Sequence, residues 1–288
     1  MIIIEASGGL GNQMFQYALY KKLESLNKNV VFDTSFFRSK QGLRELEIGV
    51  FGVQYRSVSD KEVAYIRGYG YQDNIVDKIK YKLRPSKYLI YRDSIESFQP
   101  EVLEMEDVYL CGYWQSEKYF KDIRELILKE FTFPIQAVKN NVKLTAQMKL
   151  ENSVSIHVRR SDYLTEQNLK VYGNVCTEKY YRNAINYIEG IIDNPHYYVF
   201  TDDLQWAKEY FKGDNYTIVS ENRGKDSFVD MYLMSQCKHN IIANSSFSWW
   251  GAWLNQNFDK KVLAPKKWFH NHEKDEIVCD DWIRIENR

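Results

Sequence analysis

The second half of the chain alternates between short apolar runs and stretches with helical periodicity. The apolar runs predict strands at residues 153–158, 197–201, 216–220, 240–243 and 261–264. The stretches between them predict helices at residues 177–192, 203–211, 226–236 and 247–256. A regular alternation of strand and helix is typical of a parallel sheet that carries helices on both faces.

The first half begins with a similar unit. An apolar run at residues 1–6 is followed by a glycine-rich loop, a helical stretch and a second apolar run at 29–33. The helix is predicted because apolar residues recur every three or four positions, at Phe15, Leu19, Leu23 and Leu26. Weaker patterns predict helices at 60–67 and 73–82, a strand at 108–111 and a helix capped by Ser116.

These patterns predict an α/β fold with two Rossmann-like domains, residues 1–150 and 151–288. Pro134 and the polar residues 139–141 indicate the junction between them. Residues 34–107 show no clear repeat, so the order of elements there is left open.

The composition excludes several classes of protein. Of the 288 residues, 44% are hydrophobic and 27% are charged, which is typical of a globular chain. A net charge of +0 argues against nucleic-acid binding through bulk electrostatics. No apolar run is long enough to span a bilayer, and no secretory signal is visible. The cysteines form no C-x-x-C pair, so we expect neither a zinc site nor disulfides, and a cytoplasmic protein fits best.

The first strand of the second half ends in His157-Val158-Arg159-Arg160-Ser161-Asp162. Ligands of α/β proteins bind where parallel strands end, and adjacent arginines there indicate an anion such as phosphate. Strand alternation puts Arg159 on the same face as His157 and Arg160 on the other. We therefore assign phosphate binding to Arg159 and a structural ion pair to Arg160, with a solvated surface cluster as the alternative.

Polar residues also follow two other predicted strands. Asp202 and Asp203 follow residues 197–201, and Asn244-Ser245-Ser246-Phe247 leads from 240–243 into a helix. Because the carboxyl ends of parallel strands share one edge, we expect these groups to converge on a nucleotide. The serines and the first N–H groups of the helix would hold phosphate, and Asp203 could simply cap its own helix. Neither D-x-D nor H-E-x-x-H is present, so no metal ligands are assigned.

The first glycine-rich loop favours a different function. Gly9-Leu10-Gly11-Asn12-Gln13-Met14 imitates a G-x-G-x-x-G fingerprint, and Asp33 ends the next strand. Together they would suit an NAD(P)-dependent oxidoreductase. However, Met14 stands in place of the third glycine, and its bulk opposes close packing of helix and strand. This alternative also leaves the polar groups of the second half without a role.

Several segments resemble the α-1,2-fucosyltransferases of bacteria and animals, which are glycosyltransferase family 11. They are residues 8–18 (GGLGNQMFQYA), 157–163 (HVRRSDY), 200–203 (FTDD), 230–231 (DM) and 244–254 (NSSFSWWGAWL). The second is similar to the family motif H-x-R-R-x-D-Y, with Ser161 where the family usually has glycine. The segments occur in the family's order and span most of the chain.

The resemblance implies a GT-B fold, in which two Rossmann-like domains face a cleft, and an inverting, metal-independent transfer. The C-terminal domain would bind GDP-L-fucose, and the N-terminal domain would contact the acceptor. That acceptor would be the 2-hydroxyl of a terminal galactose on an oligosaccharide or an O-antigen. Peripheral association with the inner face of a membrane is left open.

The chemistry of the side chains and the family resemblance together assign a role to each predicted site residue. Arg159 would stabilise charge on the β-phosphate, Asn12 would donate to phosphate, and Asp162 would be either the general base or an ion-pair partner. Asp230 would recognise guanine. The predicted nucleotide ligands are His157, Arg159, Asp202, Asp230, Asn244, Ser245, Ser246, Phe247, Gly11 and Asn12. A sugar-nucleotide or glycan-binding protein without catalytic activity is the remaining alternative.

Overall fold

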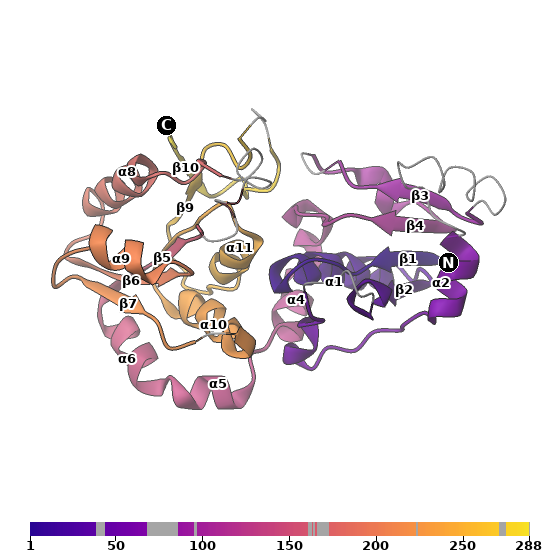
Figure 1. The fold of residues 1–288 in the computed structure, drawn as a ribbon, viewed down its shortest axis with the longest axis horizontal. Helices are drawn as coiled ribbons and strands as arrows, with labels where there is room; N and C mark the ends of the chain where they lie inside the picture. Colours follow the sequence, from indigo (N-terminus) through magenta and orange to yellow (C-terminus); the bar gives the residue numbers. More distant parts are fainter. Residues whose placement is uncertain are drawn as a thin grey trace. The chain divides into compact units, whose positions relative to one another are not determined.

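The computed structural model describes residues 1–38, 44–67, 86–94, 97–160, 163, 165, 173–222, 224–270 and 275–287. The chain divides into two compact units, Met1–Thr132 and Phe133–Arg288 (Figure 1). Each unit is α/β and is built on a parallel sheet, which confirms the predicted fold class of two Rossmann-like domains.

The N-terminal unit holds a four-stranded sheet in the order β2-β1-β4-β3. Its strands are β1 (Ile2–Glu5), β2 (Val30–Asp33), β3 (Leu89–Arg92) and β4 (Val108–Cys111). Its α-helices are α1 (Leu10–Ser25), α2 (Asp60–Arg67) and α4 (Arg124–Glu130). Short 3-10 turns lie at Ser35–Arg38, Ile48–Phe51, Pro100–Leu103, Glu117–Tyr119 and Lys121–Ile123. The helix predicted at residues 73–82 lies outside the described residues.

The C-terminal unit holds a six-stranded parallel sheet in the order β10-β9-β8-β5-β6-β7. Its strands are β5 (Asn152–Val158), β6 (Pro195–Thr201), β7 (Tyr216–Val219), β8 (His239–Ile241), β9 (Val262–Pro265) and β10 (Ile283–Ile285). Its α-helices are α5 (Ile135–Asn140), α6 (Val142–Leu150), α8 (Glu178–Glu189), α9 (Leu204–Tyr210), α10 (Phe228–Gln236) and α11 (Ser246–Trp253), with a 3-10 turn at Gly224–Asp226.

This strand order positions the site. The chain winds outward from β5 through β6 to β7, then returns to β8 on the other side of β5 and winds outward again. The direction of winding therefore reverses between β5 and β8. In open α/β sheets the crevice at such a reversal, beside the carboxyl ends of the strands, is where ligands bind.

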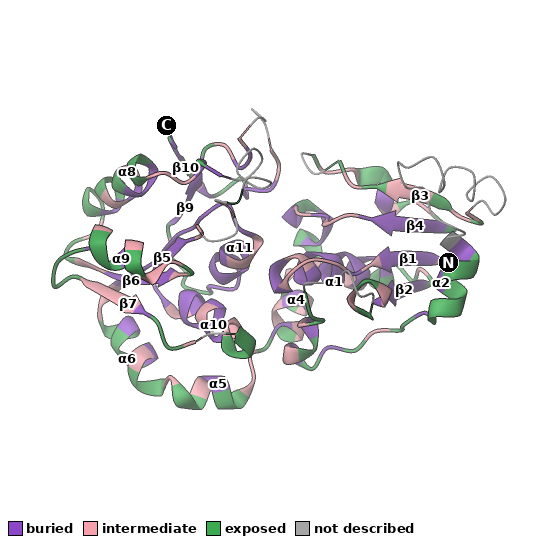
Figure 2. Ribbon diagram, in the orientation of Figure 1, coloured by how far each residue is buried: buried purple, intermediate pink, exposed green. Residues whose placement is uncertain are grey.

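Strand β5 is buried on both faces, as a central parallel strand should be. Val154, Ile156 and Val158 belong to one core cluster, together with Tyr180 and Tyr181 of α8. On the other face, a second cluster joins residues of α6, α10 and strand β6. The predicted alternation along β5 is confirmed, because Ser155 contacts Asn240 and His157 contacts Phe247, away from the first cluster. The burial of the strand itself can be followed in Figure 2.

The segment predicted as a junction folds as two helices of the C-terminal unit. Ala137 of α5 and Met148 of α6 are buried in the second core cluster, beside Leu233 and Met234 of α10. The Ser153 hydroxyl donates to the Met148 carbonyl at 2.6 Å and ties α6 to β5. The division between the units therefore falls at Thr132–Phe133, before the predicted boundary at residue 150, because these helices cover the C-terminal sheet.

Among the helices that the structure describes, none combines the length and apolar character needed to cross a membrane.

Candidate functional site

Arg159 follows β5 and is held by Asp202, the residue that follows β6. Its Nη1 lies 3.2 Å from Asp202 Oδ2, and the two side chains are 27% and 21% exposed. The other oxygen of Asp202 accepts the Arg160 backbone N–H at 2.9 Å. One carboxylate thus fixes both the backbone turn after β5 and the guanidinium of Arg159 at the strand ends.

Arg160 takes the structural position expected of it. Its Nε donates to Asp203 Oδ2 at 3.0 Å, and its guanidinium lies 4.5 Å from the Trp206 ring centroid. Asp203 Oδ1 in turn accepts the Trp206 N–H at 3.1 Å and so caps α9, as predicted. Arg160 therefore braces the start of α9, and the two adjacent carboxylates serve two different arginines.

The loops after β5 and β8 meet, as the sheet topology predicts. The Tyr163 hydroxyl donates to the Asn244 carbonyl at 2.9 Å, and the Tyr163 ring lies 5.8 Å from the Arg159 guanidinium carbon. A second link joins the rings of His157 and Phe247, whose centroids are 5.8 Å apart. Ser161 and Asp162 lie outside the described residues, so the roles of Asp162 as base or ion-pair partner stay predictions.

Helix α11 begins at the reversal point with its N-terminus uncapped by a side chain. Ser245 is its N-cap residue, and the Ser245 hydroxyl makes no capping hydrogen bond. The Asn244 side chain donates to the Trp268 carbonyl at 3.1 Å and anchors the loop. The first N–H groups of a helix have no acceptor within the helix, so this end is suited to hold a phosphate.

The tryptophans of α11 form core, as predicted. Trp249, Trp250 and Trp253 are buried, and Trp249 Nε1 donates to the Ile277 carbonyl at 2.7 Å. This packing fixes the helix whose first turn borders the strand ends.

His157 is a buried, neutral imidazole. Burial and the neighbouring Arg159 lower its pKa to about 3, and the side chain is only 6% exposed. Its Nδ1 is buried with no hydrogen-bond partner among the described residues. The Tyr181 hydroxyl donates to the His157 carbonyl at 3.1 Å and holds the backbone. A buried polar atom without a partner is costly, which makes His157 a group that a bound ligand would satisfy.

Asp230 lies in the first turn of α10, beyond β7. Its Oδ1 accepts a hydrogen bond from Asn222 Nδ2 at 2.7 Å. Burial raises the pKa of Asp230 to about 7, well above the ordinary range of an aspartate. A carboxyl group that is half-ionised near neutral pH is typical of functional sites.

The glycine-rich loop of the N-terminal unit has its own network. Asn12 Oδ1 accepts from Gln115 Nε2 at 2.7 Å. The N-terminus of α1 is occupied by a carboxylate of the chain itself, because the Leu10 N–H donates to Glu47 Oε2 at 3.1 Å. Gln13 ties the loop to residues 45–48 through the Gly8 and Glu45 carbonyls and the N–H groups of Glu47 and Ile48.

This network bears on the prediction that Gly11 and Asn12 bind phosphate. Gly11 is buried in the first turn of α1, while Asn12 is partly exposed. Their binding of phosphate stays a prediction. Sequence reasoning missed Glu47, Gln13 and Gln115, because their contacts join segments far apart in the chain and follow no local pattern.

Gly8 gives the first prediction. Its φ of +76° is left-handed, and a Cβ there would lie 2.6 Å from Asn12 Nδ2. We expect Gly8→Ala to lower the free energy of unfolding by about 1–3 kcal/mol and to displace Asn12. Gly9→Ala is the matched control, since the nearest side-chain atom would be 3.9 Å away. Urea unfolding of both variants checks this, and equal midpoints would contradict it.

Asp33 is committed to structure. It is buried, and its carboxylate accepts from the Tyr109 hydroxyl at 2.5 Å and from the Ser35 N–H at 2.8 Å. A dinucleotide-binding fold needs the acidic residue at this strand end for the ribose. The internal bonds of Asp33 therefore speak against the oxidoreductase alternative.

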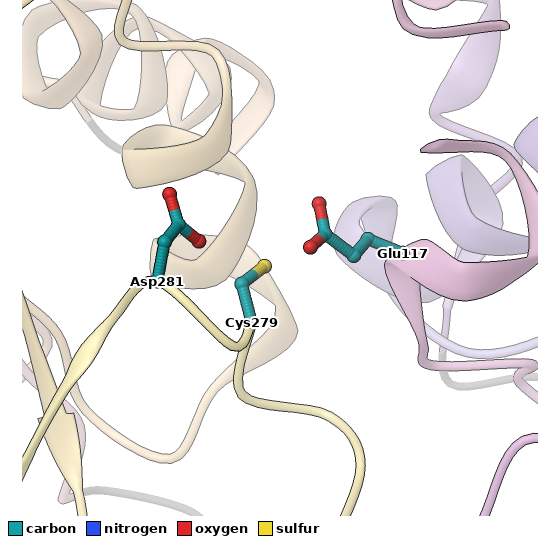
Figure 3. Close-up of side chains that lie close together, drawn as sticks. All are labelled: Glu117, Cys279 and Asp281. Carbon is teal, nitrogen blue, oxygen red and sulfur yellow. The ribbon is translucent and has the colours of Figure 1, made fainter. Parts of the chain in front are cut away.

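Glu117, Cys279 and Asp281 are residue types that can bind metals (Figure 3). Glu117 belongs to the N-terminal unit and pairs with Lys121 at 3.3 Å, whereas Cys279 and Asp281 belong to the C-terminal unit. A metal site needs its ligands held together in a fixed geometry. We therefore base no metal site on these residues.

Comparison with known proteins decides the family. The sequence model of glycosyl transferase family 11 matches residues 71–286. The chain belongs to glycosyl transferase family 11. This family 11 glycosyltransferase is 35% identical to the O-antigen biosynthesis glycosyltransferase WbnK of Escherichia coli, over 97% of this chain and 98% of that protein.

Two further relatives differ in the sugar that their names carry. An α-1,2-colitosyltransferase of Escherichia coli is 33% identical over 99% of both chains. A galactoside 2-α-L-fucosyltransferase of Bos taurus, SEC1, is 23% identical over 87% of this chain and 63% of that protein. The family 11 membership confirms the resemblance drawn from the motifs, and it sets the oxidoreductase alternative aside.

Proposed function

We propose that this enzyme transfers L-fucose from GDP-L-fucose to the 2-hydroxyl of a terminal galactose, with inversion at the anomeric carbon. The observation that carries the proposal is the cation at the reversal point. Arg159, oriented by Asp202, shares the edge between β5 and β8 with the uncapped N-terminus of α11. A guanidinium and a helix N-terminus at one strand edge suit a diphosphate better than any neutral ligand.

The proposed reaction is a single displacement. The galactose 2-hydroxyl attacks C1 of fucose, the bond from C1 to the β-phosphate oxygen breaks, and GDP leaves with the electron pair. Negative charge grows on the β-phosphate, so a fixed cation there lowers the barrier. Arg159 supplies that cation in our proposal, and the N–H groups and hydroxyls at Ser245 and Ser246 supply further donors. We therefore propose that the transfer requires no metal.

The other predicted ligands receive roles that suit their chemistry. The His157 imidazole, neutral and unpartnered at Nδ1, would hydrogen-bond the nucleotide. Asp230 would accept the N–H groups of guanine. We retain Asp162 as the proposed base for the acceptor hydroxyl, because a base must reach the reacting proton and Asp162 follows the same strand as Arg159.

The proposed acceptor is a galactose-terminated oligosaccharide or O-antigen. The name of the WbnK relative, an O-antigen biosynthesis glycosyltransferase, supports an O-antigen. The name of the bovine relative supports both fucose and galactose.

A second candidate is colitosyl transfer in the same linkage, favoured by the name of the 33% identical relative. Colitose is fucose without its 3-hydroxyl, so the two donors differ in one polar group. A site that binds this hydroxyl rejects a donor that lacks it far more strongly than an apolar site rejects an added hydroxyl.

The test is a donor competition. The enzyme is incubated with EDTA, a galactose-terminated disaccharide, and GDP-fucose and GDP-colitose first separately and then together. We expect fucose on O2 of galactose, identified by NMR of the product, with undiminished activity in EDTA. Preferred transfer of colitose would replace the first proposal by the second. Loss of activity in EDTA, restored by Mg²⁺ or Mn²⁺, would overturn the role given to Arg159.

A further inference from the structure

Helix α6 presents an apolar stripe to solvent. Val142, Ala146 and Leu150 recur every four residues and are exposed, with Leu150 86% and Val142 54% accessible. The opposite side of the helix, with Thr145 and Met148, is buried against the C-terminal unit. A surface helix normally turns its apolar side inward, and α6 has apolar residues on both sides. The outer stripe therefore needs an explanation beyond the fold.

Basic residues flank this stripe. Lys139 of α5 and Lys143 and Lys149 of α6 are all exposed. At 100° per residue, Lys143 and Lys149 lie on either side of the line through Val142, Ala146 and Leu150. Figure 2 shows much of the outer side of α5 and α6 as exposed.

The charge of this segment differs from that of the whole chain. Residues 131–150 contain no aspartate or glutamate, whereas the chain as a whole balances 39 basic against 39 acidic residues. The next acid, Glu151, is engaged by Gln147 Nε2 at 2.9 Å and by the Tyr198 hydroxyl at 2.7 Å. The α5–α6 face, meaning the exposed residues of 135–150, is thus a local basic and apolar surface on a neutral protein.

We propose that the α5–α6 face docks on an anionic membrane surface. The lysine ammonium groups would contact lipid phosphates, while Val142 and Leu150 would enter the boundary between headgroups and acyl chains. The charge complementarity of an acid-free, lysine-flanked apolar stripe selects an anionic lipid surface over a neutral one. Two short helices bury little apolar area, so the binding is weak, reversible and sensitive to salt.

The surface beyond Leu150 limits how the protein lies on the membrane. A hollow that begins at Leu150 is lined further on by Glu151, Glu189, Asp193 and Asp214. Anionic lipids repel these groups, so the contact ends at Leu150 and the protein rests on the sides of α5 and α6. This inference concerns a surface formed by α5 and α6 and depends on neither the donor nor the reaction proposed above.

The test is sedimentation of the full chain with vesicles of phosphatidylcholine alone or of phosphatidylcholine with about 40% phosphatidylglycerol. We expect binding to the anionic vesicles only, and its loss in high salt. Lys139→Glu, Lys143→Glu and Lys149→Glu combined should lower the partition coefficient at least about tenfold. Leu150→Glu alone should lower it by a smaller factor.

Matched controls carry the same charge changes elsewhere on the C-terminal unit. Lys179→Glu, Lys208→Glu and Lys212→Glu combined change three exposed lysines in and just after α8 and α9, and Ile191→Glu changes an exposed apolar residue beyond α8. These control variants should bind anionic vesicles as strongly as the unmodified chain does. The melting temperature should be unchanged in every variant, which shows that each is folded.

Three results would overturn the proposal. They are absence of vesicle binding by the unmodified chain, equal loss in the control variants, and equal binding to neutral vesicles. Light scattering could give a fourth such result. If the unmodified chain is a dimer and only the α5–α6 variants are monomeric, this face binds a second copy of the chain and not a membrane.

Discussion

Arg159→Lys should lower kcat by roughly 100- to 1,000-fold while the protein stays folded, equivalent to about 2.7–4 kcal/mol of lost transition-state stabilisation. Lysine keeps the positive charge but loses the planar fork that pairs with Asp202 and would pair with phosphate oxygens. Because the charge on phosphate grows as the glycosidic bond breaks, the loss should fall on kcat more than on KM for the donor. Steady-state kinetics with saturating acceptor measure both.

Arg160→Lys is the matched control for this experiment. It makes the same chemical change one residue further on, where the guanidinium pairs with Asp203 and lies over Trp206. We expect a lower melting temperature, because lysine loses the planar contact with Trp206. We expect a kcat within about threefold of the unmodified enzyme, because Arg160 is committed to Asp203 and α9 and not to the proposed phosphate. If the two substitutions lowered kcat equally, the assignment of Arg159 to the β-phosphate would be lost.

Asp230→Asn should weaken binding of GDP-fucose by about 10- to 100-fold, the effect of losing a charge-assisted hydrogen bond. A carboxylate accepts two N–H groups of guanine, whereas an amide accepts with only one of its two groups. Isothermal titration calorimetry gives the affinity. Discrimination against ADP should fall in the same variant, and preserved discrimination would remove Asp230 from the guanine site.

The same carboxyl predicts a pH dependence. With a pKa of about 7 in the free enzyme, Asp230 becomes ionised between pH 6 and 8. If guanine binds the ionised form, affinity for GDP-fucose should rise about tenfold over that range. The Asn variant should show no such rise. GDP-fucose suits this measurement because its diphosphate, esterified at both ends, does not titrate there.

The free energy of unfolding should fall as pH rises, whereas the affinity for GDP-fucose should increase. The pKa of Asp230 is raised from its ordinary 3.8 to about 7 in the folded chain. The folded state therefore keeps a proton that the unfolded state has released, and this contribution is lost as pH rises through 7. Asp230→Asn should melt above the unmodified enzyme at pH 8, with a smaller difference at pH 5. Differential scanning calorimetry at both values tests the sign.

The central elements of the C-terminal sheet could be predicted because their sequence patterns are strong. Strand β5 and its neighbours are apolar runs of parallel type, and Thr177 and Asp203 cap the helices that follow. Strands β3 and β10 were missed, because Leu89–Arg92 and Ile283–Ile285 are short strands at the edges of their sheets and are only partly buried. The sequence predicts a junction where α5 and α6 form, because Pro134 and the polar residues 139–141 are typical of a linker and apolar residues on both sides of α6 obscure its buried face.

The candidate site could be predicted as far as sheet topology reaches. Strand ends on one edge had to bring Arg159, Asp202 and Asn244 together, and the contacts through Tyr163 confirm that they meet. The division of labour between Asp202 and Asp203 follows from side-chain directions that only the fold determines. The carboxylate of Glu47 on the N-terminus of α1 has no signal in the sequence, because a turn more than thirty residues away supplies it.

Helices α5 and α6, which precede β5, determine where the chain can be truncated. A fragment that starts at Phe133 keeps Ala137 and Met148 over the core residues Tyr198 and Leu233, and its chain is continuous through β10. A fragment that starts at residue 151 lacks α5 and α6, which pack on this core, and its Ser153 hydroxyl loses the Met148 carbonyl as its acceptor. The longer piece is therefore the one to express as an isolated C-terminal unit, and the shorter one should aggregate.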